Sequence, residues 1–381
     1  MKNLLIIGLV FLAACTKTID KPLLPIKDGE KIRCDFGMEE FNLVKRPPVV
    51  QGGMSPTGSV GARSLTDDGV VYLDFDGQLV TNTAWNYAGD INCSSANLTA
   101  SEISAIVERV SNDYSPFNIV VTTSETVFNA APANKKIRVI ITESWEWYGL
   151  AGGTAIVNSF TWGNDTPCFI FSSLLNYSTK KIAEAVSHEA GHTLGLHHQA
   201  VYDANCVKIS EYNDGQGSGE TGWAPIMGVG YNKNLTLWHK GPNAESCTTI
   251  QDDAAQIAAI VGYKPDDYPN SSANAPNLTS SLDGMISDSS DIDFFAVSTN
   301  DYRKIYLTPF NVGINDAGAN VDLIVRVYNS QGILISTTEK PDVLYVETSV
   351  APGNYYISVG TTSNQFTTNF GMRGKYNISI Q

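Results

Sequence analysis

Apolar residues within residues 66–263 follow patterns that predict strands and helices in alternation. Continuous apolar runs, typical of buried strands, occupy residues 70–75, 119–123, 137–142, 152–160 and 168–171. Apolar residues at helical spacing occupy residues 101–114, a segment that begins near Ser178 and a last segment that begins at Asp252. The order of these elements predicts an α/β domain.

The hydrophobic pattern changes after residues 264–278, whose composition is that of a linker. From there apolar and polar residues alternate, as at Val321, Leu323 and Val325, and no helical spacing appears. We therefore expect a second domain at residues 279–381, with an all-β sandwich or jelly-roll fold.

The chain begins with the features of an export signal. Lys2 precedes a short apolar run, and Leu12-Ala13-Ala14-Cys15 resembles the lipobox of bacterial lipoproteins. The resemblance implies that residues 1–14 are removed and that a lipid on Cys15 anchors the exported protein, at the outer membrane or the cell surface. Residues 15–65 are expected to be a tether or a short prosegment. The alternative is an ordinary secretory signal that is cleaved nearby.

Composition narrows the class of protein. Of 381 residues, 43% are hydrophobic and 17% are charged, which excludes an intrinsically disordered chain. The 39 acidic residues outnumber the 25 basic ones and give a net charge of −14, so a nucleic-acid partner is not expected. We expect the chain to be a monomer.

A group of histidines carries the candidate chemistry. Residues 188–198 read HEAGHTLGLHH, and His188 and His192 are four positions apart, so on a helix they lie on one face and can bind one metal ion. Gly195 can end the helix in a sharp turn, because glycine tolerates positive φ, and His198 can then return to the metal. Three imidazoles leave a zinc ion with an open fourth position for water.

Glu189 is expected to be a general base rather than a zinc ligand, because it points roughly 100° around the helix from His188. Zinc lowers the pKa of bound water to about 7, so Glu189 can accept its proton and deliver it to a leaving amine. The alternative is a polar helix whose histidines are solvated. His197 is the spare histidine, since its spacing makes it a poorer ligand than His198.

The extended motif HExxHxxGxxH is similar to that of the metzincin clan of zinc endopeptidases. Members carry a methionine in a tight turn beneath the metal, and the resemblance assigns this role to Met227. It also implies a catalytic domain with a mixed sheet and an active-site helix. Astacin- and serralysin-like members have a tyrosine two residues after this methionine, where this chain has Val229. Tyr231 is therefore a candidate catalytic residue, with packing of the turn as the alternative.

The resemblance also implies a substrate. In metzincins an edge strand above the zinc pairs with an extended peptide, so we expect protein or peptide substrates. The residues in the corresponding place are Gly153, Thr154, Ala155 and Ile156. The alternative is a strand that lies wholly inside the sheet.

Three segments of the second domain, 291–295, 321–323 and 351–356, are similar to the pre-peptidase C-terminal type of bacterial domain. This type accompanies secreted proteases as an accessory module and is sometimes removed on maturation. Asp291 and Asp293 could contribute to a Ca²⁺ site, with simple turn acids as the alternative.

Five cysteines lie beyond the signal, and an exported protein can keep disulfides. We expect the pairs Cys206–Cys247 and Cys93–Cys168, although sequence alone does not fix connectivity. Cys34 follows an arginine, as does the prosegment cysteine that occupies zinc's open position in matrix metalloproteases. That likeness makes Cys34 a candidate latency ligand, with an unpaired surface thiol as the alternative.

The main hypothesis is therefore a lipid-anchored, exported zinc endopeptidase with Glu189 as its base. A second hypothesis is a surface adhesion or binding lipoprotein with an inactive protease-like domain. A third is a zinc hydrolase that acts on a non-protein amide or ester.

Overall fold

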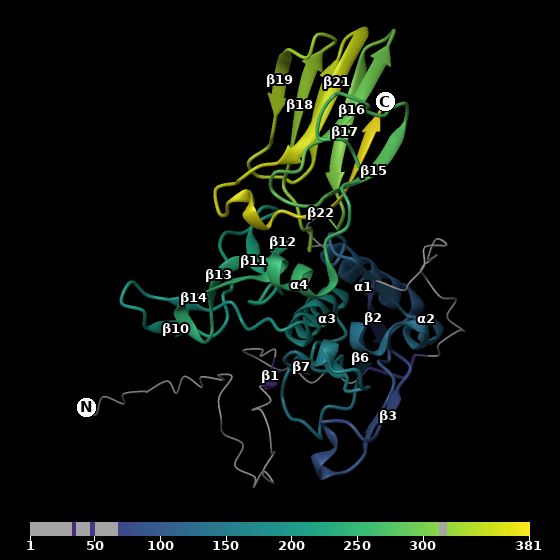
Figure 1. The fold of residues 1–381 in the computed structure, drawn as a ribbon, viewed down its shortest axis with the longest axis vertical. Coiled ribbons are helices and arrows are strands. Elements are labelled where there is room, and N and C mark those ends of the chain that lie inside the picture. Colours follow the sequence, from purple (N-terminus) through teal and green to yellow (C-terminus); the bar gives the residue numbers. More distant parts are fainter. Residues whose placement is uncertain (1–32, 36–45, 50–67, 312–317) are drawn as a thin grey trace, which may run out of the picture.

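The computed structural model describes residues 33–35, 46–49, 68–311 and 318–381. Within these residues the molecule is elongated, with a sandwich of strands stacked on a part that contains the helices (Figure 1). The helices are α1 (Ala100–Asp113), α2 (Glu125–Ala130), α3 (Thr179–Thr193) and α4 (Asp253–Val261). Residues 1–32, including Cys15, lie outside the described part.

A mixed sheet forms the centre of the α/β part. Among the described residues its strands are, in spatial order, β1 (Arg33–Asp35), β7 (Gly153–Ile156), β8 (Cys168–Phe171), β6 (Lys136–Thr142), β2 (Gly69–Asp74) and β5 (Ile119–Thr122). β8, β6, β2 and β5 run parallel, β7 is antiparallel to β8, and β1 is antiparallel to β7. The predicted α/β fold with a mixed sheet is confirmed.

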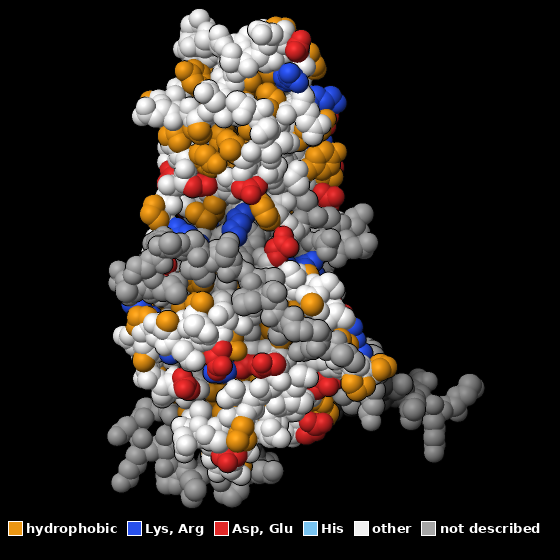
Figure 2. All heavy atoms as spheres, turned by 90° about the vertical axis from the view of Figure 1, so that its right-hand side faces the viewer, with side chains coloured by type: hydrophobic (Ala, Val, Ile, Leu, Met, Phe, Trp, Pro, Cys, Tyr) orange, Lys and Arg blue, Asp and Glu red, His pale blue; other side chains and the backbone are white. Residues whose placement is uncertain are grey.

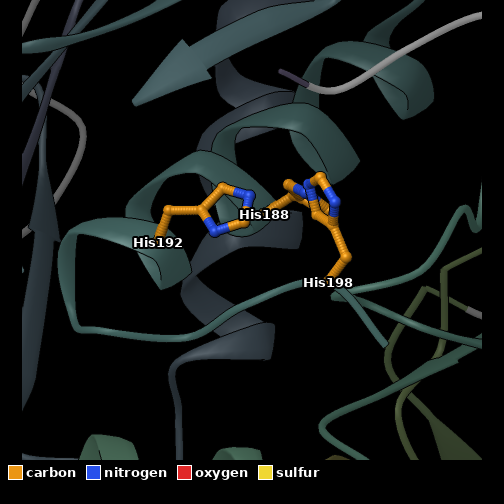
Figure 3. Close-up of side chains that lie close together, drawn as sticks. All are labelled: His188, His192 and His198. Atoms are coloured by element: carbon orange, nitrogen blue, oxygen red, sulfur yellow. The ribbon is translucent and has the colours of Figure 1, made fainter. Parts of the chain in front are cut away.

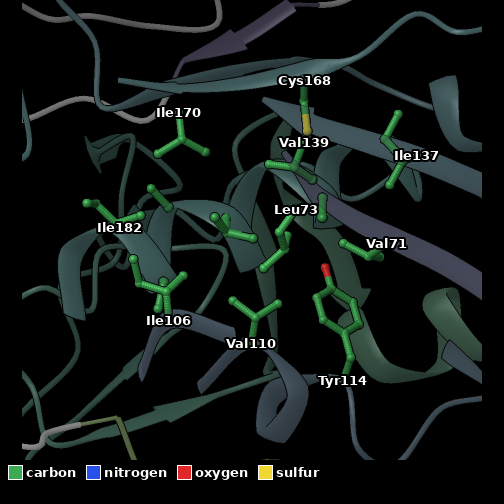
Figure 4. Close-up of a cluster of buried hydrophobic side chains, with 14 of the residues drawn as sticks. Val71, Leu73, Ile106, Val110, Tyr114, Ile137, Val139, Cys168, Ile170 and Ile182 are labelled. Atoms are coloured by element: carbon green, nitrogen blue, oxygen red, sulfur yellow. The ribbon is translucent and has the colours of Figure 1, made fainter. Parts of the chain in front are cut away.

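α1 and α3 cover one face of this sheet, and their apolar stripes build the main core (Figure 4). α1 begins with a capping box: the Thr99 side chain accepts a hydrogen bond from Glu102 N, and the Glu102 side chain accepts one from Thr99 N. Its apolar side chains pack on alternate residues of β2 and β6, such as Leu73 and Val139. The core holds α3, and with it the histidine motif, rigidly against the sheet.

The opposite face of the sheet carries a second cluster, which corrects one predicted disulfide. Cys93, on the hairpin of β3 (Gln78–Val80) and β4 (Ile91–Cys93), packs in this second cluster beside Phe169. Cys168 belongs to the first cluster instead (Figure 4), because neighbouring strand residues point to opposite faces. Both thiols are buried and free, so the predicted Cys93–Cys168 pair is wrong.

Three short two-stranded pairs follow α3 in the described part. Their strands are β9 (Val201–Tyr202), β10 (Lys208–Ser210), β11 (Trp223–Pro225), β12 (Leu235–Leu237), β13 (Lys240–Asn243) and β14 (Ser246–Asp252). The pairs β9–β10 and β13–β14 are antiparallel, and β11–β12 is parallel. The predicted Cys206–Cys247 disulfide is confirmed and links the β9–β10 hairpin to the β13–β14 hairpin. A disulfide favours an oxidising compartment outside the cytoplasm.

The remaining strands form the predicted all-β sandwich. One antiparallel sheet has the order β15 (Ser281–Ile286), β22 (Gly374–Ile380), β17 (Arg303–Pro309) and β20 (Val346–Val350). The other has the order β16 (Asp293–Thr299), β21 (Gly353–Thr361), β18 (Leu323–Asn329) and β19 (Leu334–Thr338). Their inward-facing side chains form one buried cluster, which confirms the fold expected from the period of two.

Two local expectations differ from the structure. The strand expected over 152–160 ends at Ile156, because Asn158 adopts a left-handed conformation with φ of +67° and a 3-10 turn follows. α2 is short and was not expected from the sequence pattern. Its N-cap is Ser124, whose side chain accepts a hydrogen bond from Val127 N.

On the face shown in Figure 2, Lys and Arg side chains of the described residues are scattered rather than gathered into one patch. The basic side chains thus form no patch on this face, and acidic residues outnumber basic ones in the whole sequence, with a net charge of −14. None of the described helices is long and apolar enough to cross a membrane.

Candidate metal centre

α3 presents two histidines one turn apart on the same side. The helix begins after Ser178, whose side chain caps it by accepting from Lys181 N. His188 and His192 are fully buried, and their ring centroids are 4.6 Å apart. The predicted placement of the first two candidate ligands on one helix face is therefore seen in the structure.

The chain turns back at Gly195 and brings in the third histidine. Gly195 has φ of +92°, and a Cβ atom there would lie 2.5 Å from Oδ1 of Asn158, so glycine is required. His198 then lies 4.8 Å from His192 and 5.2 Å from His188 between ring centroids. Figure 3 shows the three imidazoles converging on one another. One nitrogen from each lies within 4.8 Å of the other two.

The Nδ1 atoms of these rings are engaged on the side away from the centre. Nδ1 of His188 lies 2.8 Å from Ile226 O, and Nδ1 of His192 lies 2.6 Å from Leu196 O. Because carbonyl oxygens only accept, each Nδ1 carries the proton and each Nε2 presents a lone pair. Burial, with the neighbouring imidazoles, lowers the pKa of both rings well below the usual value, so they are neutral.

Three buried imidazoles fit a metal ion. Nε2 of His192 is buried and has no hydrogen-bond partner, which is costly unless an ion takes its lone pair. Neutral imidazole suits several transition metals, and a set of three nitrogens with one open position is typical of catalytic zinc. The chain therefore has a candidate metal site of three buried histidines.

Glu211 orients the third histidine, a role that the sequence pattern did not predict. Its Oε1 lies 3.1 Å from Nδ1 of His198, and its Oε2 accepts from Lys208 Nζ at 2.8 Å. Burial alone would raise the pKa of Glu211, but the bonds from His198 and Lys208 outweigh it and lower the pKa to about 2. A carboxylate behind a metal-binding histidine fixes its tautomer and strengthens it as a ligand.

Replacing Glu211 by glutamine should weaken zinc binding by about tenfold to a hundredfold, since the amide orients His198 less firmly. The matched control is Glu245→Gln, because Glu245 lies 3.4 Å from His197 on the exposed side of the motif. Competition with a chromophoric chelator measures both affinities. Equal zinc affinities for the two variants would show that Glu211 does not strengthen zinc binding.

Met227 lies close to Gly191 of α3, in a turn closed by the hydrogen bond from Gly228 N to Pro225 O. It is fully buried, and a Cβ atom at Gly191 would lie 2.7 Å from its sulfur. The absence of a side chain at Gly191 thus leaves room for the sulfur against α3. Its role as the metzincin methionine stays a prediction.

Glu189 follows His188 on α3, and its side chain lies close to β7. It is fully buried, and a Cβ atom at Gly153 would lie 2.8 Å from its Cγ and 3.0 Å from its Oε1. The glycine on β7 therefore makes room for the carboxylate. Tyr231 packs in the main core, where burial, followed by the Glu189 charge, raises the pKa of its hydroxyl well above the usual value. A catalytic role for Tyr231 stays a prediction.

The predicted substrate edge required β7 to be the outermost strand of the sheet. In the described sheet β1 lies outside it. Residues 33–35 pair with it antiparallel, with Cys34 opposite Ala155 and Asp35 opposite Thr154. An extended segment of the chain thus takes the edge at which a peptide was expected. The side chain of Cys34 lies outside the described part, and its role as a latency ligand stays a prediction.

A separate acidic cluster lies where the linker meets the sandwich. Carboxylate oxygens of Asp266, Asp291 and Asp293 lie within 4.8 Å of one another. One oxygen each of Asp291 and Asp293 is buried without a hydrogen-bond partner. Oxygen ligands of this kind suit Ca²⁺, which stays a prediction for this cluster.

Calcium should stabilise the chain against heat, and more strongly at pH 8 than at pH 6. Burial raises the pKa of Asp293 to about 9, so the folded chain favours the protonated carboxyl. Without calcium, the free energy of unfolding therefore falls as pH rises from about 4, the ordinary pKa, toward 9. A bound cation reverses this loss by favouring the ionised carboxylate. At one hundred times its dissociation constant, calcium would add about 2.7 kcal/mol. Thermal unfolding measures the effect, and an equal calcium shift in Asp293→Asn would contradict the site.

No protein-family model and no curated protein matches this chain. Among solved structures, the chain is similar to the pre-peptidase C-terminal domain of a collagenase from Bacillus anthracis, with 13% identity and a TM-score of 0.22, over 31% of this chain and 98% of that chain. It is also similar to PliG, a periplasmic lysozyme inhibitor from Aeromonas hydrophila, with 13% identity and a TM-score of 0.19, over 29% of this chain and 91% of that chain. The C-terminal β part thus has a distant structural likeness to a pre-peptidase C-terminal domain, and at these scores neither likeness bears on function.

Proposed function

We propose that this chain is an exported zinc-dependent endopeptidase that hydrolyses extended protein substrates. The observation that carries the proposal is the buried group of His188, His192 and His198, with Glu189 on the same helix. Burying three imidazoles and a carboxylate costs stability, because polar groups placed inside a protein lose their hydration. A catalytic metal accounts for all four side chains together.

His188, His192 and His198 would hold the zinc ion. When bound, zinc supplies Lewis acidity to polarise the scissile carbonyl and to make water more acidic. The protein groups behind the ligands, Ile226 O, Leu196 O and Glu211, keep each Nε2 aimed inward.

Glu189 would move the protons. It accepts a proton from the attacking water as the new carbon–oxygen bond forms, and it delivers that proton to the amide nitrogen as the carbon–nitrogen bond breaks. The products are a carboxylic acid and an amine, which become a carboxylate and an ammonium group when the remaining proton of the water passes from one to the other. The tight fit of the carboxylate against Gly153 limits its rotamers, which supports a fixed position for this base.

β7 would bind the substrate backbone by strand addition. The antiparallel pairing of residues 33–35 with β7 supports this proposal, because an extended segment already lies along this edge. A protein substrate would have to displace those residues, so the N-terminal segment and the substrate would compete for one place.

The proposed location follows from the sequence and the disulfide. Cys206–Cys247 favours an oxidising compartment, and the lipobox-like sequence supports a lipid anchor at Cys15 in the outer membrane or at the cell surface. We propose no nucleic-acid partner and a monomeric enzyme.

Cleavage of an unfolded protein such as casein tests the function against both alternatives. We expect peptide-bond cleavage that a zinc chelator abolishes and added zinc restores. Binding of partners without cleavage would favour the adhesion lipoprotein. Hydrolysis of small amides or esters, with casein left intact, would favour the non-protein hydrolase.

A further inference from the structure

The sandwich shares its core with the segment beneath the candidate metal site. Trp223, Leu235 and Leu237, which lie on β11 and β12, belong to the buried cluster of the sandwich. β11 and β12 pair in parallel, and the loop between them contains Met227. The two strands that flank Met227 are thus fixed by the sandwich.

Backbone contacts continue this attachment. Thr236 N donates to Ala319 O at 2.9 Å, and Leu235 and Ala319 form a parallel β-bridge. The indole of Trp223 donates to Phe366 O at 2.8 Å. Such a junction of main-chain hydrogen bonds and common apolar core is typical of the inside of a domain rather than of a detachable module.

A buried polar side chain of the sandwich reaches farther, to the helices. Asn320 is 3% exposed, and its amide donates to Asp113 Oδ1 at 2.8 Å and to Thr236 O at 2.7 Å. Its Oδ1 accepts from the amide of Asn112. The side chain thus joins the end of α1 and β12 to the sandwich.

Asp113 also forms a hydrogen bond with a residue of α3. Its second oxygen accepts from the hydroxyl of Ser187, and Ser187 O accepts from Tyr114 OH at 2.9 Å. Ser187 is fully buried and immediately precedes His188 and Glu189. The hydrogen-bonded chain Asn320–Asp113–Ser187 therefore ends on the helical turn that carries the proposed ligand and base.

We propose that the sandwich is a fixed part of the peptidase, and that Asn320 is a positioning residue that orients the turn of α3 carrying His188 and Glu189. The inference rests on the proposed function. It departs from the expectation of an accessory module of a type that is sometimes removed on maturation, because removal would expose the shared core and leave Asp113 without the amide donor of Asn320. A satisfied buried network fixes one geometry, whereas a broken one leaves several of similar energy.

Steady-state kinetics of Asn320→Ala, with Val359→Ala as the matched control, tests this inference. Val359 lies fully buried in the sandwich core, so its truncation lowers the melting temperature through lost packing alone. We expect Asn320→Ala to lower kcat about tenfold to a hundredfold with KM within twofold, and Val359→Ala to keep the kcat of the wild type. Ser187→Ala, which breaks the same contact from the α3 side, should repeat the loss and add nothing in the double variant.

The absorption spectrum of the Co²⁺-loaded protein gives a readout that does not depend on peptidase activity. We expect the ligand-field bands to shift in Asn320→Ala and Ser187→Ala and to stay unchanged in Val359→Ala. Wild-type kcat and an unchanged spectrum in both network variants would overturn the inference, as would equal changes in Val359→Ala. If the wild type binds Co²⁺ and cleaves no protein, the proposed function fails while the spectra still decide the role of Asn320.

Discussion

Replacing His198 by alanine is expected to remove zinc from the chain and to abolish hydrolysis, whereas replacing its neighbour His197 is expected to do neither. His198 is buried with Glu211 behind it, and one of its nitrogens lies within 4.8 Å of those of His188 and His192. The side chain of His197 is 21% exposed and faces Glu245 instead. Loss of one of three protein ligands leaves too few donors for a stable site.

Metal analysis of the two purified variants after dialysis measures the difference. Each substitution removes one imidazole from the same short segment, so changes in charge and composition are matched. Zinc retained by His198→Ala, or lost from His197→Ala, would show that the histidine pair has been assigned the wrong way round.

Replacing Glu189 by glutamine is expected to lower kcat by about 10²- to 10⁴-fold while zinc stays bound, since general acid–base catalysis contributes factors of this size. Glutamine has nearly the same shape, so it fits against Gly153 as the carboxylate does, but it cannot accept the proton of the attacking water. The variant thus separates proton transfer from metal binding and from folding.

Hydrolysis of a fluorogenic peptide, with the zinc content of the same sample, measures this effect. Zinc content equal to that of the wild type is the control for an intact site. A Glu189→Gln variant that keeps both its zinc and its full kcat would mean that another group carries the proton.

Local patterns in the sequence predicted most of the elements that position the site. α3 follows from its cap at Ser178 and its apolar stripe, and the turn at Gly195 follows from the need for positive φ. Buried parallel strands such as β8 follow from continuous apolar runs. The spacing of the three histidines predicted a common metal site, because one helix and one tight turn fix their relative positions.

Features that depend on contacts between distant segments could not be predicted in this way. Glu211 lies in a loop-rich stretch without periodicity, and only the fold brings it to His198. Asn320 and Asp113 are 207 residues apart in the chain. The pairing of Cys93 with Cys168 failed because the sheet separates the clusters in which they pack, and the side to which a strand residue points depends on its register.

Titration of the metal-free chain with zinc, followed by the rate of peptide hydrolysis, tests the central claim most directly. We expect no hydrolysis without zinc, a rise in rate as zinc is added and a plateau at one zinc per chain, because His188, His192 and His198 form a single site. Hydrolysis that is equally fast before zinc is added, or a fully loaded chain that cleaves no peptide, would contradict it.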